Sequence, residues 1–217
     1  MNSQTFTLGD GEEIPLIFES RRGLRNITLR PKTTPTREIC ISLPRWTPAS
    51  TALRFLEQKR AWIEKIFAAA PRKIRLAEGD TIAVFGKEFL VSVAVLGGRP
   101  EFLERRMRDK IKEMFLARVK EIIRTVPANL RPARIAVRDT TSRWGSCSTT
   151  GTMSLSWRLA LAPPEIMRYV IMHELAHRQH MDHSPAFWAT VVQLYGPGVG
   201  RAKLWLSKNG AELHKYF

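Results

Sequence analysis

Residues 173–183 read HELAHRQHMDH, and they contain four of the five histidines of the chain. The first five of them form the pattern H-E-x-x-H. On a helix, His173 and His177 lie one turn apart on the same face, so both imidazole rings can reach a single cation. Glu174 follows the first histidine directly, where its carboxylate can act on a metal-bound water as a general base. The pattern therefore predicts a helix that carries the core of a zinc-dependent hydrolase site.

A catalytic zinc site normally has three protein ligands, so a third must join His173 and His177. His180 lies on the same helical face, but a straight helix rises about 1.5 Å per residue and places it roughly 10 Å along from His173. His183 lies in a predicted turn at 182–185, which can fold its ring back toward the first two histidines. We therefore predict His183 as the third ligand, in preference to a downstream carboxylate. We interpret His180 as a polar residue near a helix end.

Apolar spacing and Gly, Pro and Asp breakers predict the elements around this segment. In the first half we expect strands at 5–8, 14–19, 26–30 and 38–43, a helix from about residue 50, and further strands within 73–96. In the second half we expect helices at 101–125, from Pro163 through the motif, at 185–195 and at 201–206, with strands at 134–138 and 152–157. A break at 97–100 divides the chain into a β-rich domain with one helix (1–98) and a domain that carries the motif (99–217). The fold class is therefore α+β.

The composition is that of a globular protein without a membrane segment. The chain has 217 residues and only two cysteines, which form no disulfide framework and fit a reducing cytosol. Its N-terminus has no secretory signal pattern and its longest apolar stretch is too short to span a bilayer, so we expect a cytoplasmic protein. The net charge of +15 is spread along the chain and is densest at 99–143. A solvated basic surface explains it, and a polyanion-binding face is the alternative.

The offset of ten residues from His173 to His183 equals that of the metzincin pattern H-E-x-x-H-x-x-G-x-x-H. That pattern needs a glycine for its sharp turn, and residues 173–183 contain none. No methionine follows Met181, so the metzincin Met-turn is absent from the sequence as well. The spacing alone therefore does not place the chain in that clan.

Several separated motifs instead resemble the YgjP-like predicted metal-dependent hydrolases, which are similar to HtpX-type zinc peptidases and, more distantly, to SprT-like proteases. These motifs are WGSC at 144–147, Pro163, Tyr169-Val170, HELAH at 173–177, His183-Ser184 and Phe187-Trp188. The resemblance covers roughly residues 14–210 and is most specific from 143 to 188. It implies a zincin-like core, zinc held by His173, His177 and His183, and Glu174 as catalytic base. The usual asparagine before the third histidine is Asp182 here, which leaves the ligand set intact.

Several roles stay open at the level of sequence. An oxyanion stabiliser is needed besides zinc, and the candidates are His180, Tyr169, Tyr195, Arg143 and Arg178. The segment 144–147 either lines the site or forms a tight turn packed by Trp144. The strand at 152–157 is a candidate edge for pairing with an extended peptide substrate.

Three hypotheses for the function follow. The first is a zinc metallopeptidase that acts on a peptide or protein. The second is a nucleic-acid-associated, SprT-like protease that acts on protein–DNA complexes. The third is a metal-stabilised binding module without turnover.

Overall fold

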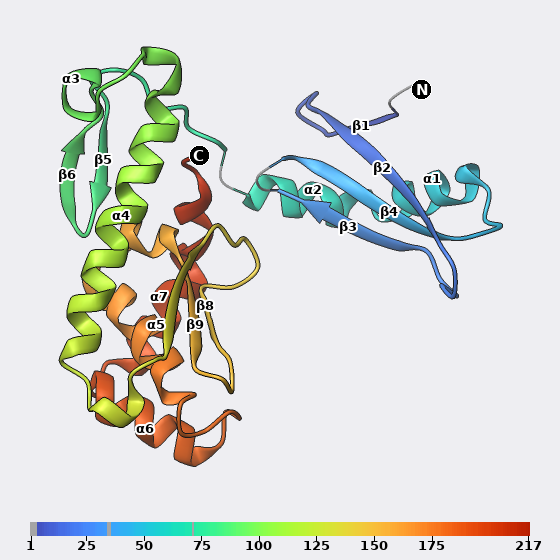
Figure 1. Ribbon diagram of the computed structural model, residues 1–217. Coiled ribbons are helices and arrows are strands. Elements are labelled where there is room, and N and C mark those ends of the chain that lie inside the picture. The colour runs from blue at the N-terminus through green and yellow to red at the C-terminus, as the bar shows by residue number, and fades with distance from the viewer. Residues whose placement is uncertain (1–3, 34–35, 71) are drawn as a thin grey trace. The chain divides into compact units, whose positions relative to one another are not determined.

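The computed structural model describes residues 4–33, 36–70 and 72–217, and it forms two compact units, Met1–Arg72 and Lys73–Phe217 (Figure 1). The division falls after Arg72, and not at the expected break between residues 98 and 99. Residues 73–98 belong to the second unit because their apolar side chains, among them Ile82 and Val91, are buried in the same core as the long helix that follows.

The first unit is a four-stranded sheet accompanied by two helices. The strands are β1 (Thr5–Thr7), β2 (Glu13–Arg21), β3 (Thr28–Lys32) and β4 (Glu38–Pro44), in the order β1-β2-β4-β3. Strands β2 and β4 are parallel, and the other pairs are antiparallel. The four predicted strands are thus confirmed, but the single predicted helix is two, α1 (Ala49–Gln58) and α2 (Arg60–Ala69), which meet at Lys59.

The second unit begins with a hairpin and a long helix. Strands β5 (Thr81–Val84) and β6 (Lys87–Leu90) are antiparallel, and a short helix α3 (Val93–Leu96) follows them. After a 3-10 turn, η1 (Pro100–Phe102), helix α4 runs over Leu103–Arg124. Its buried residues recur every four positions and so share one face, as the predicted helix at 101–125 required: Leu103, Met107, Ile111, Phe115, Val119 and Ile123.

A three-stranded sheet and three helices complete the second unit. After η2 (Ala128–Leu130) come β7 (Arg134–Arg138), β8 (Gly145–Cys147) and β9 (Thr152–Ser156), followed by η3 (Trp157–Leu161), α5 (Pro164–Ala176), α6 (Pro185–Tyr195), α7 (Val199–Asn209) and η4 (Gly210–His214). The sheet order is β7-β9-β8, with β7 parallel and β8 antiparallel to β9. The predicted elements of this region are present, and β8 is an additional strand.

Helix α5 lies in the middle of this unit and carries the H-E-x-x-H pattern. Most of its residues are buried, and it contacts β8, β9, α6 and α7. A β-rich N-terminal part and a helical C-terminal part confirm the predicted α+β class. Within the described ranges, none of the helices combines the length and the apolar character that crossing a membrane requires.

Candidate metal centre

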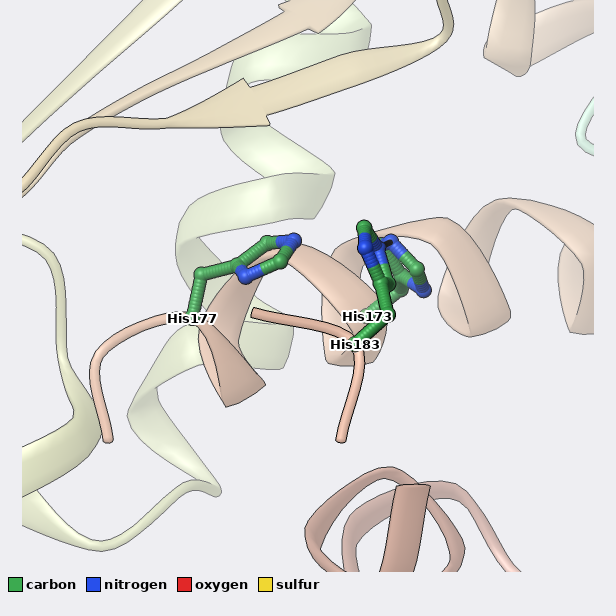
Figure 2. A group of neighbouring side chains, drawn as sticks. All are labelled: His173, His177 and His183. Carbon is green, nitrogen blue, oxygen red and sulfur yellow. Dashed lines mark hydrogen bonds between the residues drawn. The ribbon is translucent and has the colours of Figure 1, made fainter. Parts of the chain in front are cut away.

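Three histidines of the motif segment meet at the end of helix α5 (Figure 2). His173 lies in the last turn of α5, His177 caps its C-terminus, and His183 lies just before Ser184, the N-cap of α6. One ring nitrogen from each histidine lies within 4.8 Å of the others, and the Nε2 atoms of His173 and His183 are 3.3 Å apart. The structure therefore brings together the three residues that were predicted as ligands.

His180 does not join this group, although the reason differs from the predicted one. Helix α5 ends at Ala176, so His180 lies in the turn beyond the helix and not on its face. Its backbone oxygen lies 2.9 Å from Nδ1 of His177. A carbonyl oxygen can only accept, so Nδ1 of His177 is the donor and Nε2 keeps a free lone pair. The turn thus selects the tautomer of His177 that can bind a metal through Nε2.

The aromatic residues after the third histidine form a wall around the cluster. The ring of Phe187, which is fully buried, lies 4.9, 4.5 and 4.7 Å from the rings of His173, His177 and His183. Trp188 packs beside His173, with 5.7 Å between their ring centroids. Burial, with the neighbouring His177 and His183, lowers the pKa of His173 to about 4. His173 is therefore neutral near pH 7, which is the form that binds a metal ion.

The donor set fits a metal ion. Three imidazole nitrogens beside aromatic rings suit a borderline transition metal such as zinc, copper, iron or nickel, and not the oxygen-seeking ions magnesium and calcium. Three protein ligands also match a site that leaves one coordination position open for chemistry.

Glu174 lies beside the histidines but outside their group. Its side chain is 5% exposed, and this burial raises the pKa of its carboxyl group to about 7, while the positive charge of Arg143 opposes the rise. Strand β8 covers the carboxyl group, because a Cβ atom on Gly145 would lie 2.6 Å from Cγ and Oε1 of Glu174. A carboxyl group with such a pKa can take up and release a proton near neutral pH.

The structure decides between the two roles that the sequence left open for the segment 144–147, because residues 145–147 form strand β8 and not a tight turn. Gly145 lines the site, whereas Trp144 packs against the C-terminal turn, with its ring 5.2 Å from that of His214. The strand that these residues form, β8, was missed at the level of sequence because it is three residues long and made of small side chains. The glycine within a short segment of polar and small residues was the available signal.

The prediction that the strand at 152–157 offers a free edge to a peptide is wrong. Strand β9 lies between β7 and β8, so its backbone groups are already paired on both sides. Among the described residues β8 is the strand at the free edge on the side of helix α5. Trp144 and Ser148 pair with β9, and because pairing alternates along an antiparallel strand, the backbone groups of Gly145 and Cys147 point away from it.

The candidate oxyanion stabilisers lie in different places. Tyr169 is buried, its ring 6.1 Å from that of His173, and burial together with the charge of Glu174 raises its pKa to about 12. Tyr195 packs on Tyr169 with 5.5 Å between ring centroids. The guanidinium of Arg178 lies over the β8–β9 turn at Gly151, whereas Arg143 is exposed on the loop that leads into β8. Of the two candidate arginines, Arg143 is the one whose positive charge lowers the pKa of Glu174.

Two comparisons with known proteins found a match. The family model described as YgjP-like, metallopeptidase domain matches residues 97–209. Among solved structures, the metallopeptidase zymogen of Pyrococcus abyssi abylysin is 26% identical, covers 48% of this chain and 97% of its own, and has a TM-score of 0.35. No curated protein matches the chain.

Proposed function

The chain belongs to the YgjP-like family of metallopeptidase domains, and from that membership we propose that it is a zinc-dependent peptidase. In this proposal His173, His177 and His183 hold the metal ion, and Glu174 is the general base. The observation that carries it is the meeting of three imidazole nitrogens within 4.8 Å beside a buried carboxyl group whose pKa is about 7. Zinc is proposed over other metals because three histidines are a common ligand set of catalytic zinc sites.

When bound, the zinc ion would supply Lewis-acid chemistry that activates water and polarises a carbonyl group. Glu174 then holds the proton that leaves the attacking water, and returns it to the amine of the departing peptide segment. Its pKa near 7 suits both steps, because a group that is too acidic would not take the proton and one that is too basic would not release it.

The free edge of β8 is proposed to hold the substrate backbone. The N–H and C=O groups of Gly145 and Cys147 point away from β9, so an extended peptide can add to this edge as a further strand. Gly145 packs on Glu174, which places this edge next to the catalytic base. Peptides in which one backbone amide is replaced by an ester test the pairing, because a lost N–H donor at a paired position should raise KM and leave kcat unchanged.

The function is tested by comparing the wild type with Glu174→Gln on a mixture of denatured proteins, with metal analysis of both. Glutamine keeps the shape of the side chain but cannot take up the proton. We expect both proteins to hold equal zinc and the variant to lose at least about a hundredfold in rate. Equal turnover by the two proteins contradicts a role for Glu174. Bound metal with no turnover by the wild type supports a metal-stabilised binding module instead.

A second candidate is association with nucleic acid, and one surface of the first unit favours it. The side chain of Trp46 is 86% exposed, and the guanidinium of Arg45 lies 5.2 Å from its ring centroid. Arg21, at the end of the neighbouring strand, pairs in register with Pro44, so Arg22 follows beside the same loop. An exposed indole among arginines is suited to stacking on a base while the cations meet phosphates.

This candidate predicts that single-stranded DNA binds the protein with an affinity that falls steeply with salt. Trp46→Ala should weaken that binding by about tenfold, whereas Trp62→Ala, at a half-exposed helical position of the same unit, should not. Weak binding that is independent of salt contradicts the candidate.

A further inference from the structure

A small basic cavity lies on the three-stranded sheet, over residues of β7, β9, β8 and the loop that joins β7 to β8. Its volume is about 240 Å³. Two exposed arginines and three hydroxyl residues line it, together with Gly145 and Leu155: Arg138, Arg143, Thr140, Ser146 and Ser154. We call it the arginine pocket.

The arginine pocket opens on the face of the sheet opposite to helix α5. Ser146 pairs in register with Ser154, and side chains at paired positions lie on the same face. The next pair, Gly145 and Leu155, points to the other face, where Leu155 is fully buried and Gly145 meets Glu174. Strand β8 therefore separates the pocket from the catalytic carboxyl group by the thickness of one backbone.

The two arginines of the pocket are not engaged in ion pairs within the second unit. Among residues 73–217, all of which the structure describes, neither Arg138 nor Arg143 makes an ion pair. The acid next in sequence, Asp139, is paired with the buried side chain of Arg158, and Glu174 lies behind Gly145. Two guanidinium groups beside several hydroxyl groups are suited to binding a negatively charged group, because each hydrogen bond that a guanidinium donates to it is charge-assisted.

We propose that the arginine pocket is a subsite for an anionic side chain of the substrate, either the carboxylate of Asp or Glu or the phosphate of a phosphorylated serine. This inference rests on the proposed peptidase function. A peptide added to the edge of β8 turns successive side chains to opposite faces of the sheet. A side chain that points away from helix α5 then lies on the face of the sheet that carries the pocket, with Ser146 of β8 nearest to it and Arg138 on the far strand β7. Its neighbours in the peptide point toward the catalytic residues. The enzyme consequently prefers acidic peptides.

The test uses peptides that differ at one position near the cleaved bond, which carries Glu, Gln or phosphoserine. We expect kcat/KM for the Glu or the phosphoserine peptide to exceed that for the Gln peptide by about tenfold or more at the preferred position. The larger of the two ratios identifies which anion the pocket takes. Arg138→Gln and Arg143→Gln should each bring the ratio close to one.

Arg134→Gln is the matched control. Arg134 lies on the same strand and the same face as Arg138, it is exposed, and it does not line the pocket. This variant should keep the wild-type ratio, because the loss of one surface charge elsewhere does not remove a direct contact. A ratio that falls equally in all three variants would show that general charge attraction, and not the pocket, sets the preference.

Binding separates a failure of this inference from a failure of the proposed function. Labelled Glu and Gln peptides are titrated into Glu174→Gln protein and followed by fluorescence anisotropy. Tighter binding of the Glu peptide that Arg138→Gln abolishes supports the pocket even if the wild type cleaves nothing, in which case only the peptidase proposal fails. Equal binding and equal turnover of both peptides overturn the pocket while leaving the peptidase proposal intact.

Discussion

Gly145 and Glu174 are in contact across the site: a Cβ atom on Gly145 would lie 2.6 Å from both Cγ and Oε1 of Glu174. No real Cβ atom approaches another group so closely, so glycine is the residue that allows β8 and helix α5 to pack at this distance. Two motifs that are far apart in the sequence, WGSC and HELAH, are therefore parts of one structure. The edge strand covers the carboxyl group and excludes water from it, which is the cause of its raised pKa.

The first prediction concerns Gly145→Ala. The added methyl group must displace the Glu174 side chain, and a displacement of about 1 Å in a catalytic group costs on the order of a hundredfold in kcat. We expect this loss with the metal content unchanged, since none of the three proposed metal-binding histidines is touched. Gly200→Ala is the control, because nothing lies within 4 Å of a Cβ atom there. Wild-type kcat in Gly145→Ala would contradict the role assigned to this contact.

The second prediction is that His183 and His180, three residues apart, contribute differently to zinc affinity. His183→Ala should lower zinc affinity by at least about a hundredfold, because it removes one of three proposed ligands. His180→Ala should leave the affinity nearly unchanged, since His180 contributes its backbone oxygen to His177. Zinc titration by calorimetry measures both. In parallel, a chelator should lower the Tm of the wild type but change that of His183→Ala little, because a metal that binds the folded state stabilises it.

The third prediction is the pH dependence of catalysis. Glu174 must be ionised to act as a base, so with its pKa near 7 the value of kcat/KM should rise as the pH passes upward through about 7. The positive charge of Arg143 holds this pKa down, and Arg143→Gln should therefore move the midpoint to higher pH. A pH–rate profile of each protein with a neutral peptide measures the shift. A midpoint that moves to lower pH would exclude this electrostatic link.

The fourth prediction concerns stability and uses His214, which is buried against Trp144. Burial and the charges of Arg158 and Lys73 lower its pKa to about 4, whereas in the unfolded chain it is about 6.5. The unfolded state then binds more protons, so the stability contributed by neutral His214 is present above pH 6.5 and is lost as the pH falls toward 4.

His214→Phe keeps an aromatic ring beside Trp144 but cannot bind a proton. Between pH 7 and pH 5 the free energy of unfolding of the wild type should fall by up to about 2 kcal/mol more than that of the variant. Urea unfolding at the two pH values measures the difference. Parallel curves for the two proteins would show that His214 is accessible to protons in the folded state.

Local signals in the sequence were sufficient for most helices and strands. The prolines at 163–164 and Ser184-Pro185 mark the starts of α5 and α6, and Gly196 marks the end of α6, because capping and φ preferences depend on a few neighbouring residues. The same holds for the ligand set, since the spacing of His173, His177 and His183 predicted the three residues that lie together in the structure.

The features that the sequence left open or misplaced depend on contacts between distant segments. The expected break at 97–100 contains two glycines and a proline, but whether residues 73–98 pack with α4 is decided by a shared core. Strand β8 is too short to show a pattern, and the central place of β9 follows from which strands pair on either side of it. The sequence by itself therefore predicted the three histidines that meet and the carboxyl group beside them, because a helix sets the spacing of His173, Glu174 and His177 and a turn brings His183 back to them. Only the tertiary structure decided that β8 is the free edge, that Gly145 buries Glu174 and that two arginines meet in one pocket, because these depend on packing between segments that no local spacing encodes.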